Sequence, residues 1–515
     1  MRDDRRDLLR ALFSLSNTTQ VKEFARSLHQ LGWEIISTKE TTPLLKEIQI
    51  PCIDIESFVG ISEDYGFPPT LHPKIESALT LEQTDKRIDL LFDIPYSLDQ
   101  GNDVGGHTLL ALAVKGNRIP IMSYTDMERC IGEFKVNGKV SDSLKAEFTN
   151  KTLVHIAAHY VKLLQQQDSF GEGIVSIKNL ELSSGENPYQ SPCHLFSDFG
   201  DNDPLSLHKF ELLGKEAPCF TNLADLDSIL QTLCLAHEAF KKEFRQSPFL
   251  AIASKHGNPC GFAIDWKDPA VALENALFGN PQAVWGGEFI CNFPITDDLV
   301  NLLIDSSVRQ EMLGTRNWML DVVVAPSFSP YAVETLSQRK NRKIFRNKTL
   351  VDPMLPNQPW GLRWVRGGMI RQPPANYILD LKSSYWVGED PSKEQIESLI
   401  LAWATVWSSN LGGNEVALVK GRQLVGLGGG PSTIIAIRNA VCRAQEQGHS
   451  MESSVFAADA FFPFIDGPQV LLEAGCNLGL VPQGGKKEEE IKKIFSKNAI
   501  SMCYVPKQFR GFCRH

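Results

Sequence analysis

Residues 249–261 read Phe-Leu-Ala-Ile-Ala-Ser-Lys-His-Gly-Asn-Pro-Cys-Gly. The first five residues are apolar and predict a β-strand, and the turn-forming residues near the end of the stretch predict where that strand stops. Lys255 and His256 therefore stand at a strand end, a position where α/β proteins commonly place reactive groups. The alternative is that both side chains simply solvate the end of a strand.

The sequence on both sides of this stretch predicts an α/β protein. Residues 8–167 alternate short apolar runs with helical periodicity, which is typical of strand and helix units around a parallel sheet. Residues 319–325 form an apolar run broken only by Asp321 and predict a strand buried on both faces. Residues 394–406 predict a helix that opens a further set of elements. The length favours three domains, which we place at residues 1–168, 175–350 and 351–515.

The composition is that of a folded globular protein. Of 515 residues, 43% are hydrophobic and 22% are charged. The net charge of −9 has the wrong sign for neutralising a phosphate backbone, so we expect no nucleic-acid partner. The 11 cysteines form no Cys-x-x-Cys pair, and no apolar run approaches the roughly 18 to 20 residues that cross a bilayer. We expect a cytoplasmic protein without a membrane partner.

Two short motifs carry weak signals. Gly428-Gly429-Gly430 lies between a predicted strand and a predicted helix, as a phosphate-binding loop would, but it lacks the Walker lysine and the G-x-G-x-x-G spacing. A plain tight turn and a phosphate site both stay open, and the turn is favoured. Pro259-Cys260 matches half of a zinc-deaminase motif, yet Ala263 stands where the second cysteine belongs. We therefore predict no metal site and no zinc.

Several further motifs occur in a fixed order along nearly the whole chain. They are residues 70–74 (TLHPK), 103–106 (DVGG), 185–188 (GENP), 255–261 (KHGNPCG), 285–287 (WGG), 367–368 (GG), 459–464 (DAFFPF) and 514–515 (RH). In order and spacing they resemble the bifunctional purine-biosynthesis family that joins AICAR transformylase to IMP cyclohydrolase.

The resemblance implies a fold and a reaction. The fold is a methylglyoxal-synthase-like, Rossmann-type N-terminal domain followed by two cytidine-deaminase-like α/β domains, in a homodimer whose transformylase sites lie at the subunit interface. The reaction transfers a formyl group from 10-formyltetrahydrofolate to the 5-amino group of aminoimidazole carboxamide ribotide (AICAR), or of a close analogue, in de novo purine biosynthesis. That amine is conjugated with its ring and is a poor nucleophile, so a positioned base is needed.

The resemblance also implies roles for individual residues. His256 would accept and shuttle the proton, and Lys255 would stabilise the oxyanion that develops on the formyl carbon. Asn414 would orient the reacting groups. Asn410 is its rival, because glycines replace the lysine and serine that precede the asparagine in the family.

Further residues would bind the two substrates. The folate is flat and heteroaromatic and suits apolar walls. Ordinary core packing is the alternative for one or two of the three aromatic residues in the segment 459–464. The implied folate contacts are Phe461, Pro463 and Phe464, and the implied contacts to the purine intermediate are Asn222, Gly287 and Arg510.

The chain departs from the family at its anion-binding positions. Ser183 and Ser184 replace an arginine and a tyrosine that engage the nucleotide, and Ile434 replaces a second arginine. In the N-terminal domain, Phe67 and Pro69 replace an arginine and a lysine.

The N-terminal phosphate loop is also altered. Residues 37–41 lack the two glycines of the family and carry Glu40, whose charge repels phosphate. We therefore expect weak or absent cyclohydrolase activity. The residues of the cyclohydrolase site that remain are Ser14, Ser16, Thr70, Asp103 and Lys115.

Two other functions follow from these departures. The missing arginines are compatible with a non-catalytic relative that binds folate or a purine intermediate. Zinc-dependent nucleoside deamination rests on fold analogy alone, and the absence of zinc ligands argues against it.

Overall fold

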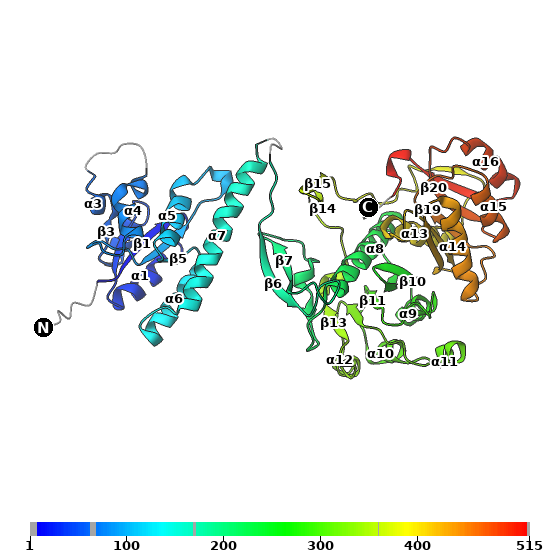
Figure 1. Ribbon diagram of the computed structural model, residues 1–515, viewed down its shortest axis with the longest axis horizontal. Helices are drawn as coiled ribbons and strands as arrows, with labels where there is room; N and C mark the ends of the chain where they lie inside the picture. Colours follow the sequence, from blue (N-terminus) through cyan, green and yellow to red (C-terminus); the bar gives the residue numbers. More distant parts are fainter. Residues whose placement is uncertain (1–7, 62–67, 168–170, 359, 512–515) are drawn as a thin grey trace. The chain divides into compact units, whose positions relative to one another are not determined.

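The computed structural model describes residues 8–61, 68–167, 171–358 and 360–511, which form two compact units (Figure 1). Unit 1 comprises Met1–Ile177 and Ser197–Gly200, and unit 2 comprises Lys178–Phe196 and Asp201–His515. None of the helices in the described ranges combines the length and the apolar content that a membrane crossing requires.

Unit 1 is built on a five-stranded sheet in which every neighbouring pair is parallel, in the order β3-β2-β1-β4-β5. Alternate residues of a strand point to opposite faces, so Phe13 and Leu12 enter different apolar clusters. The strands are β1 (Arg10–Leu15), β2 (Glu34–Ser37), β3 (Ile53–Asp54), β4 (Leu90–Ile94) and β5 (Ile119–Ile121).

Helices cover both faces of this sheet. α1, α6 and α7 contribute to the cluster that contains Phe13, and α3, α4 and α5 contribute to the cluster that contains Leu12. The helices are α1 (Val21–Gln30), α2 (Thr42–Glu47), α3 (Ile55–Val59), α4 (Pro73–Thr80), α5 (Val104–Lys115), α6 (Tyr124–Asn137) and α7 (Asp142–Gln165). β6 (Ser176–Leu182) and β7 (Cys193–Asp198) form a two-stranded sheet, and the chain passes from one unit to the other within β6, within β7 and after Gly200.

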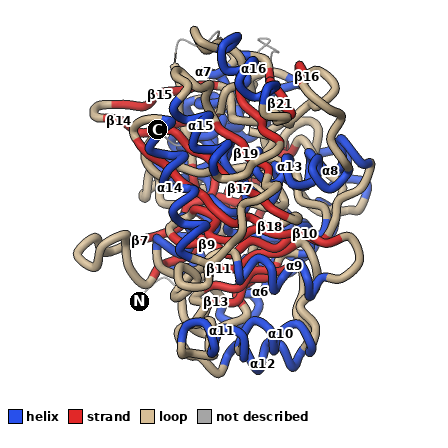
Figure 2. Tube along the Cα trace, turned by 90° about the vertical axis from the view of Figure 1, so that its right-hand side faces the viewer, coloured by secondary structure: helices blue, strands red, loops and turns tan. Residues whose placement is uncertain are grey.

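Unit 2 contains one mixed sheet of twelve strands in the order β16-β21-β20-β19-β17-β18-β10-β9-β11-β12-β13-β8, part of which crosses the centre of Figure 2. The strands are β8 (Glu211–Leu212), β9 (Phe249–Lys255), β10 (Asn258–Asp265), β11 (Glu288–Cys291), β12 (Val322–Ala325), β13 (Lys343–Arg346), β16 (Tyr385–Val387), β17 (Asn414–Lys420), β18 (Gln423–Gly430), β19 (Val455–Ala458), β20 (Leu478–Pro482) and β21 (Ser501–Val505). β14 (Gly361–Val365) and β15 (Gly368–Gln372) form a separate hairpin.

Two long helices share one face of the twelve-stranded sheet. Leu250 and Ile252 of β9 pack with α8 and α13, whereas Ala251 and Ala253 of the same strand point into the cluster formed with α9, α10 and α12. α14, α15 and α16 cover the other half of that second face. The helices are α8 (Phe220–Phe244), α9 (Pro269–Phe278), α10 (Asp297–Ile304), α11 (Ser307–Leu313), α12 (Pro330–Ser337), α13 (Lys393–Ser408), α14 (Thr433–Glu446), α15 (Asp466–Glu473) and α16 (Glu488–Lys497).

The sheet consists of two halves with the same order of elements. In each half a long helix precedes a hairpin, a helix and three further strands: α8, β9, β10, α9, β11 to β13 in the first, and α13, β17, β18, α14, β19 to β21 in the second. β17 begins 414 − 249 = 165 residues after β9, and β18 begins 423 − 258 = 165 residues after β10. The predicted strand at 249–253, the buried strand within 319–325 and the helix at 394–406 are confirmed as β9, β12 and α13. The division of unit 2 at residue 350 stays a prediction.

The glycine run at 428–430 is not a turn. These residues are buried and complete β18, so the favoured interpretation was wrong. A Cβ atom on Gly428 would lie 2.2 Å from the Ala436 carbonyl oxygen, and one on Gly426 would lie 2.4 Å from the Ala440 carbonyl oxygen. The glycines therefore allow α14 to pack directly on the strand backbone.

Candidate functional sites

The Lys-His motif forms the turn of a β-hairpin between β9 and β10. His256 and Gly257 have φ angles of 60° and 69°, which is the left-handed pair that a two-residue type I′ turn requires. The Lys255 side chain is half-buried, and its ammonium donates a hydrogen bond to the Gly286 carbonyl oxygen. The His256 side chain is exposed on the single chain. The turn thus anchors the lysine and presents the imidazole outward.

A buried carboxyl group that the sequence did not point to lies beside this turn. Glu288 begins β11, pairs with Ser254 across the sheet and accepts a hydrogen bond from the Ser254 hydroxyl at 3.0 Å. Burial, reinforced by the neighbouring Asp225 carboxylate, raises the pKa of Glu288 to about 8, and the Lys255 ammonium acts in the opposite direction. The signal available in the sequence was an acidic residue at the start of an otherwise apolar strand.

The register of the sheet brings several of the predicted transformylase residues to one side of the sheet, where strands begin or end. We call this side the functional edge. β9 ends at this edge with Lys255, and β11 begins there with Glu288. β10 and β18 are antiparallel, so β18 ends where β10 begins, with Gly430 opposite Asn414 at the start of β17. β19 is antiparallel to β17 and ends at the same edge, directly before Asp459. Residues far apart in sequence therefore share one end of the sheet.

The two candidate asparagines lie differently at this edge. The Asn410 backbone N–H donates to the Asn258 side chain at 2.8 Å, and the Asn258 amide donates back to the Asn410 carbonyl at 3.3 Å. The Asn414 side chain instead donates to the Gly430 carbonyl and accepts from the Thr433 hydroxyl, each at 3.4 Å. The loop of Asn410 is thus the part bonded to the Lys-His hairpin.

Two further buried carboxyl groups stand behind this loop. Glu415 accepts a hydrogen bond from the Leu411 N–H at 2.7 Å, and Asp459 accepts one from the Glu415 N–H at 3.0 Å. The Glu415 Oε2 and Asp459 Oδ2 atoms have no hydrogen-bond partner among the described residues. Burial raises the pKa of Asp459 to about 8 and also raises the pKa of Glu415. Both groups are held in the protonated form more readily than an exposed carboxyl.

The aromatic string after Asp459 divides between core and surface. Phe462 is buried and packs near Phe456 and Phe495, so core packing explains this ring. The three residues implied as folate contacts are not in the core. Phe461 is half-buried, Pro463 is exposed, and Phe464 is 61% exposed.

The implied contacts to the purine intermediate come from three separate segments of the chain. Asn222 sits in the first turn of α8, where its side chain accepts a hydrogen bond from the Cys219 N–H at 3.1 Å. Gly287 is buried, and a Cβ atom there would lie 2.3 Å from the Ser254 carbonyl oxygen. Arg510 is exposed and precedes Gly511, whose N–H donates to the Asp459 carbonyl at 3.0 Å. The final Arg514-His515 motif lies outside the described residues.

Unit 1 contains a cavity of about 550 Å³ at the carboxyl ends of β1, β2 and β4. β2 and β4 flank β1 on opposite sides, so the cavity occupies the point where the strand order reverses, the usual ligand position in such sheets. Four of the five predicted cyclohydrolase residues line it: Ser14, Ser16, Thr70 and Asp103. Pro69 also lines it, whereas Phe67 lies outside the described residues.

Lys115 does not line the cavity. It stands in the last turn of α5, whereas Asp103 caps the first turn of the same helix. Its side chain is 66% exposed, and its ammonium lies 3.7 Å from Glu76. The structure therefore separates this residue from the other four.

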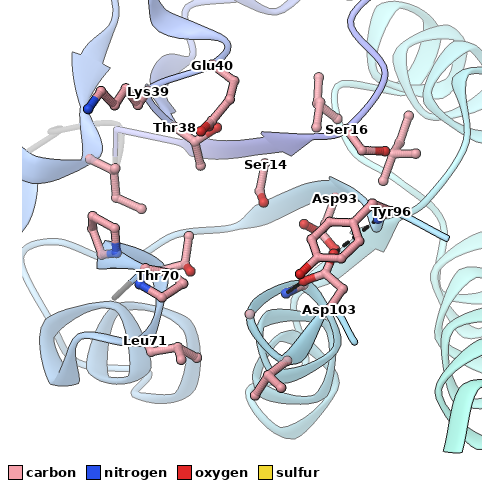
Figure 3. Close-up of a pocket in the computed structure, with 18 of the residues that line it drawn as sticks. Ser14, Ser16, Thr38, Lys39, Glu40, Thr70, Leu71, Asp93, Tyr96 and Asp103 are labelled. Carbon is pink, nitrogen blue, oxygen red and sulfur yellow. Dashed lines mark hydrogen bonds between the residues drawn. The ribbon is translucent and has the colours of Figure 1, made fainter. Parts of the chain in front are cut away.

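The floor of the cavity holds two buried carboxyl groups, both labelled in Figure 3. Asp103 accepts hydrogen bonds from the Gly106 N–H at 2.7 Å and from the Tyr96 N–H at 3.1 Å. Burial raises the pKa of Asp93 to about 7, the Ser14 hydroxyl partly opposes this rise, and the Asp103 carboxylate adds to it. The sequence signal for Asp93 was a single acidic residue within the apolar strand β4.

Within the described ranges, no group of three or more histidine, cysteine or acidic side chains is arranged to hold a metal ion.

Comparison with known proteins identifies the family of the chain. The family model of the AICARFT/IMPCHase bienzyme matches residues 118–443. The bifunctional purine biosynthesis protein PurH of Ruminiclostridium cellulolyticum is 26% identical over 96% of this chain and 98% of that protein. The PurH proteins of Acetivibrio thermocellus and Neisseria meningitidis are each 27% identical over 96% of this chain, and the match covers 98% and 97% of those proteins. The chain therefore belongs to the AICARFT/IMPCHase bienzyme family and is an AICAR transformylase/IMP cyclohydrolase-like protein of the purine-biosynthesis class.

Proposed function

We propose that unit 2 is a formyltransferase that moves a formyl group from 10-formyltetrahydrofolate to the 5-amino group of AICAR or a close analogue. The observation that carries the proposal is the common sheet edge, where Lys255, His256, the Asn410 loop and Asp459 meet. An exposed imidazole can take a proton from the attacking amine, and the anchored ammonium can stabilise a developing oxyanion.

Two parts of the proposal concern the architecture. We assign a methylglyoxal-synthase-like fold to unit 1 and two cytidine-deaminase-like folds to the halves of unit 2. The repeated order of elements and the five-stranded parallel sheet support this assignment. We also propose a cytoplasmic homodimer in which the partner subunit completes each transformylase site. Light scattering on the purified chain should give twice the mass of 57.4 kDa, and a monomer at micromolar concentration would contradict this part.

The test of formyl transfer uses the purified full chain with 10-formyltetrahydrofolate and AICAR, and follows tetrahydrofolate release by absorbance. His256→Ala should reduce the rate by about 10² to 10⁴, the range of general acid–base catalysis. No release with the ribotide, the nucleoside or the free base would remove the proposal.

The second half of the sheet offers a matched control. Lys420 ends β17 as Lys255 ends β9, 165 residues earlier, and both precede a turn with two positive φ angles. Lys420 bonds to Ser450 and lies at the opposite edge of the sheet. Lys255→Ala should lower kcat by at least about 10², as does the loss of one oxyanion donor. Lys420→Ala should leave kcat unchanged, and equal effects of both variants would refute the assigned role of Lys255.

We propose that the cyclohydrolase reaction is weak or absent. Lys115 stands away from the cavity, and Pro69 replaces a lysine of the family at its wall. Formylated AICAR incubated with the chain should form IMP no faster than it does without protein, measured by absorbance. Formation of IMP at the rate of formyl transfer would show that the site still works.

A second candidate function is binding without turnover. Serines at 183 and 184 and isoleucine at 434 supply none of the arginine contacts that clamp a phosphate in the family. Calorimetric binding of folate without formyl transfer to any acceptor would favour this candidate.

A further inference from the structure

The cavity of unit 1 is lined by more carboxyl groups than cations. Asp93 and Asp103 form its floor, and Glu40 and Glu56 are exposed at its wall. Lys39 is the one lysine or arginine among the described lining residues. Its ammonium points away from Asp93 and Asp103 in Figure 3. A dianionic phosphate placed here would meet more negative than positive charge.

Three backbone N–H groups at the helix end and in the loop beside the cavity already bond to the protein. Helix α5 begins at the cavity, but the Asp103 carboxylate caps its first turn and accepts from the Gly106 N–H at 2.7 Å. In the loop after β2, the N–H groups of Thr41 and Thr42 donate to the Thr38 carbonyl at 3.0 and 2.9 Å. Neither the helix end nor this loop offers these donors to a phosphate.

The cavity does offer unused acceptors. Asp93 is 1% exposed, and its Oδ2 atom has no hydrogen-bond partner among the described residues. A buried acceptor without a donor is costly, so a ligand that brings hydroxyl or N–H donors would be stabilised there. The hydroxyl groups of Ser14 and Thr70 also line the cavity. The polar lining therefore complements a neutral ligand rich in donors.

We propose that this cavity binds an uncharged purine ribonucleoside and discriminates against the corresponding 5′-phosphate. The volume of about 550 Å³ lies in the range of sites for molecules of this size. A ribonucleoside supplies sugar hydroxyls and base N–H groups, and the purine class follows from the family of the chain. This inference rests on one part of the proposed function, namely that the cyclohydrolase reaction is weak or absent. For that reason the experiments below measure binding and not turnover.

The first experiment compares inosine with IMP by titration calorimetry on the full chain at low ionic strength. We expect the dissociation constant for IMP to be at least about tenfold higher than that for inosine, because the phosphate faces like charge. Equal affinities, or tighter binding of IMP, would overturn the proposal.

Variants assign the binding to the cavity. Asp93→Ala removes the unpartnered acceptor and should weaken inosine binding by about tenfold, while circular dichroism checks that the chain stays folded. Asp93→Asn keeps one acceptor oxygen and should weaken it less. Inosine binding that survives Asp93→Ala unchanged, or that His256→Ala abolishes, would place the ligand in unit 2 and refute the proposal.

A charge variant tests the discrimination itself. Glu40→Gln should increase the affinity for IMP severalfold and leave that for inosine unchanged. Glu47→Gln is the matched control, because Glu47 is exposed, pairs with Lys22 and does not line the cavity. A loss of formyl transfer in the wild type leaves all these binding results interpretable, so the two proposals fail separately.

Discussion

At the scale of single residues, four carboxyl groups share one physical situation. Asp93, Glu288, Glu415 and Asp459 are buried, and burial raises the pKa of each. All four lie at the cavity or at the functional edge of the unit 2 sheet. Carboxyl groups with shifted pKa values are typical of functional sites, so the positions of these four groups support the proposed sites.

The Asp93 carboxyl group predicts a pH-dependent stability. Its pKa of about 7 in the folded chain is above the unfolded value, so the folded state binds the proton more tightly. This contribution to the free energy of unfolding is complete below about pH 4 and is lost as the pH rises through 7. Between pH 5 and pH 8 it should fall by about 3 kcal/mol. Asp93→Asn should remove this fall, measured by urea unfolding at both pH values.

A second buried group, His155, also makes the stability of the wild type depend on pH, so the wild type has to be compared with the Asp93→Asn variant. Burial, with the nearby His107 and His159, lowers the pKa of His155 to about 4. Its contribution has the opposite sign, since stability is lost as the pH falls below about 6.5 toward 4. The difference between wild type and Asp93→Asn cancels this term. An identical pH dependence of the two chains would contradict the raised pKa that burial gives the Asp93 carboxyl group.

At the scale of elements, the strand and helix contact between β18 and α14 depends on glycine. A side chain at Gly428 would overlap the α14 backbone, since its Cβ would lie 2.2 Å from both the Ala436 carbonyl oxygen and the Ala440 nitrogen. Gly428→Ala should therefore reduce the free energy of unfolding by about 3 kcal/mol, the upper part of the overpacking range. Thermal unfolding of the purified variant measures this loss.

Gly368 in β15 supplies the control for this substitution. It lies in the same unit, and a Cβ atom there would have no neighbour within 4 Å. Gly368→Ala should change stability by less than about 0.5 kcal/mol. If Gly428→Ala were equally mild, the helix would not rest on the strand as described.

At the scale of the whole of unit 2, a hydrogen bond from the Trp266 indole to the buried Glu397 carboxylate joins the two halves. Glu397 of α13 is 0% exposed, accepts a hydrogen bond from the Trp266 indole at 2.6 Å and pairs with Arg422. Trp266 follows β10 of the first half, whereas Glu397 and Arg422 belong to the second. The hydrogen bond between Trp266 and Glu397 therefore stabilises the junction of the two halves of the sheet.

Removing the carboxylate should therefore destabilise the entire unit. Glu397→Ala leaves Arg422 without its buried partner and should cost about 3 kcal/mol. Glu394→Ala, in the exposed first turn of the same helix, should cost less than about 0.5 kcal/mol. Chemical unfolding followed by tryptophan fluorescence compares the two variants, and similar midpoints would show that the Glu397 carboxylate does not hold the two halves together.

The sequence predicted the strands and helices wherever one periodicity prevailed. β9, β12 and α13 have clear apolar patterns, and their burial follows directly from those patterns. The prediction of a turn at Gly428-Gly429-Gly430 was wrong. A glycine that lets a helix pack closely on a strand cannot be told from a turn glycine by residue type alone. The repeat of 165 residues was also missed, since it is carried by the order of elements rather than by similar residues.

The amino-acid sequence by itself determined the α/β class, the family motifs and the loss of arginines at the anion-binding positions, because each of these is a property of residue type and local spacing. Only the tertiary structure decided which of those residues meet. In the folded chain, Asn410 is hydrogen-bonded to the Lys-His hairpin and Lys115 lies away from the cavity. Glu288, Asp459 and Asp93 are buried. The physical reason is that strand order and register, which join distant segments, fix both the proximity and the desolvation that shift a pKa.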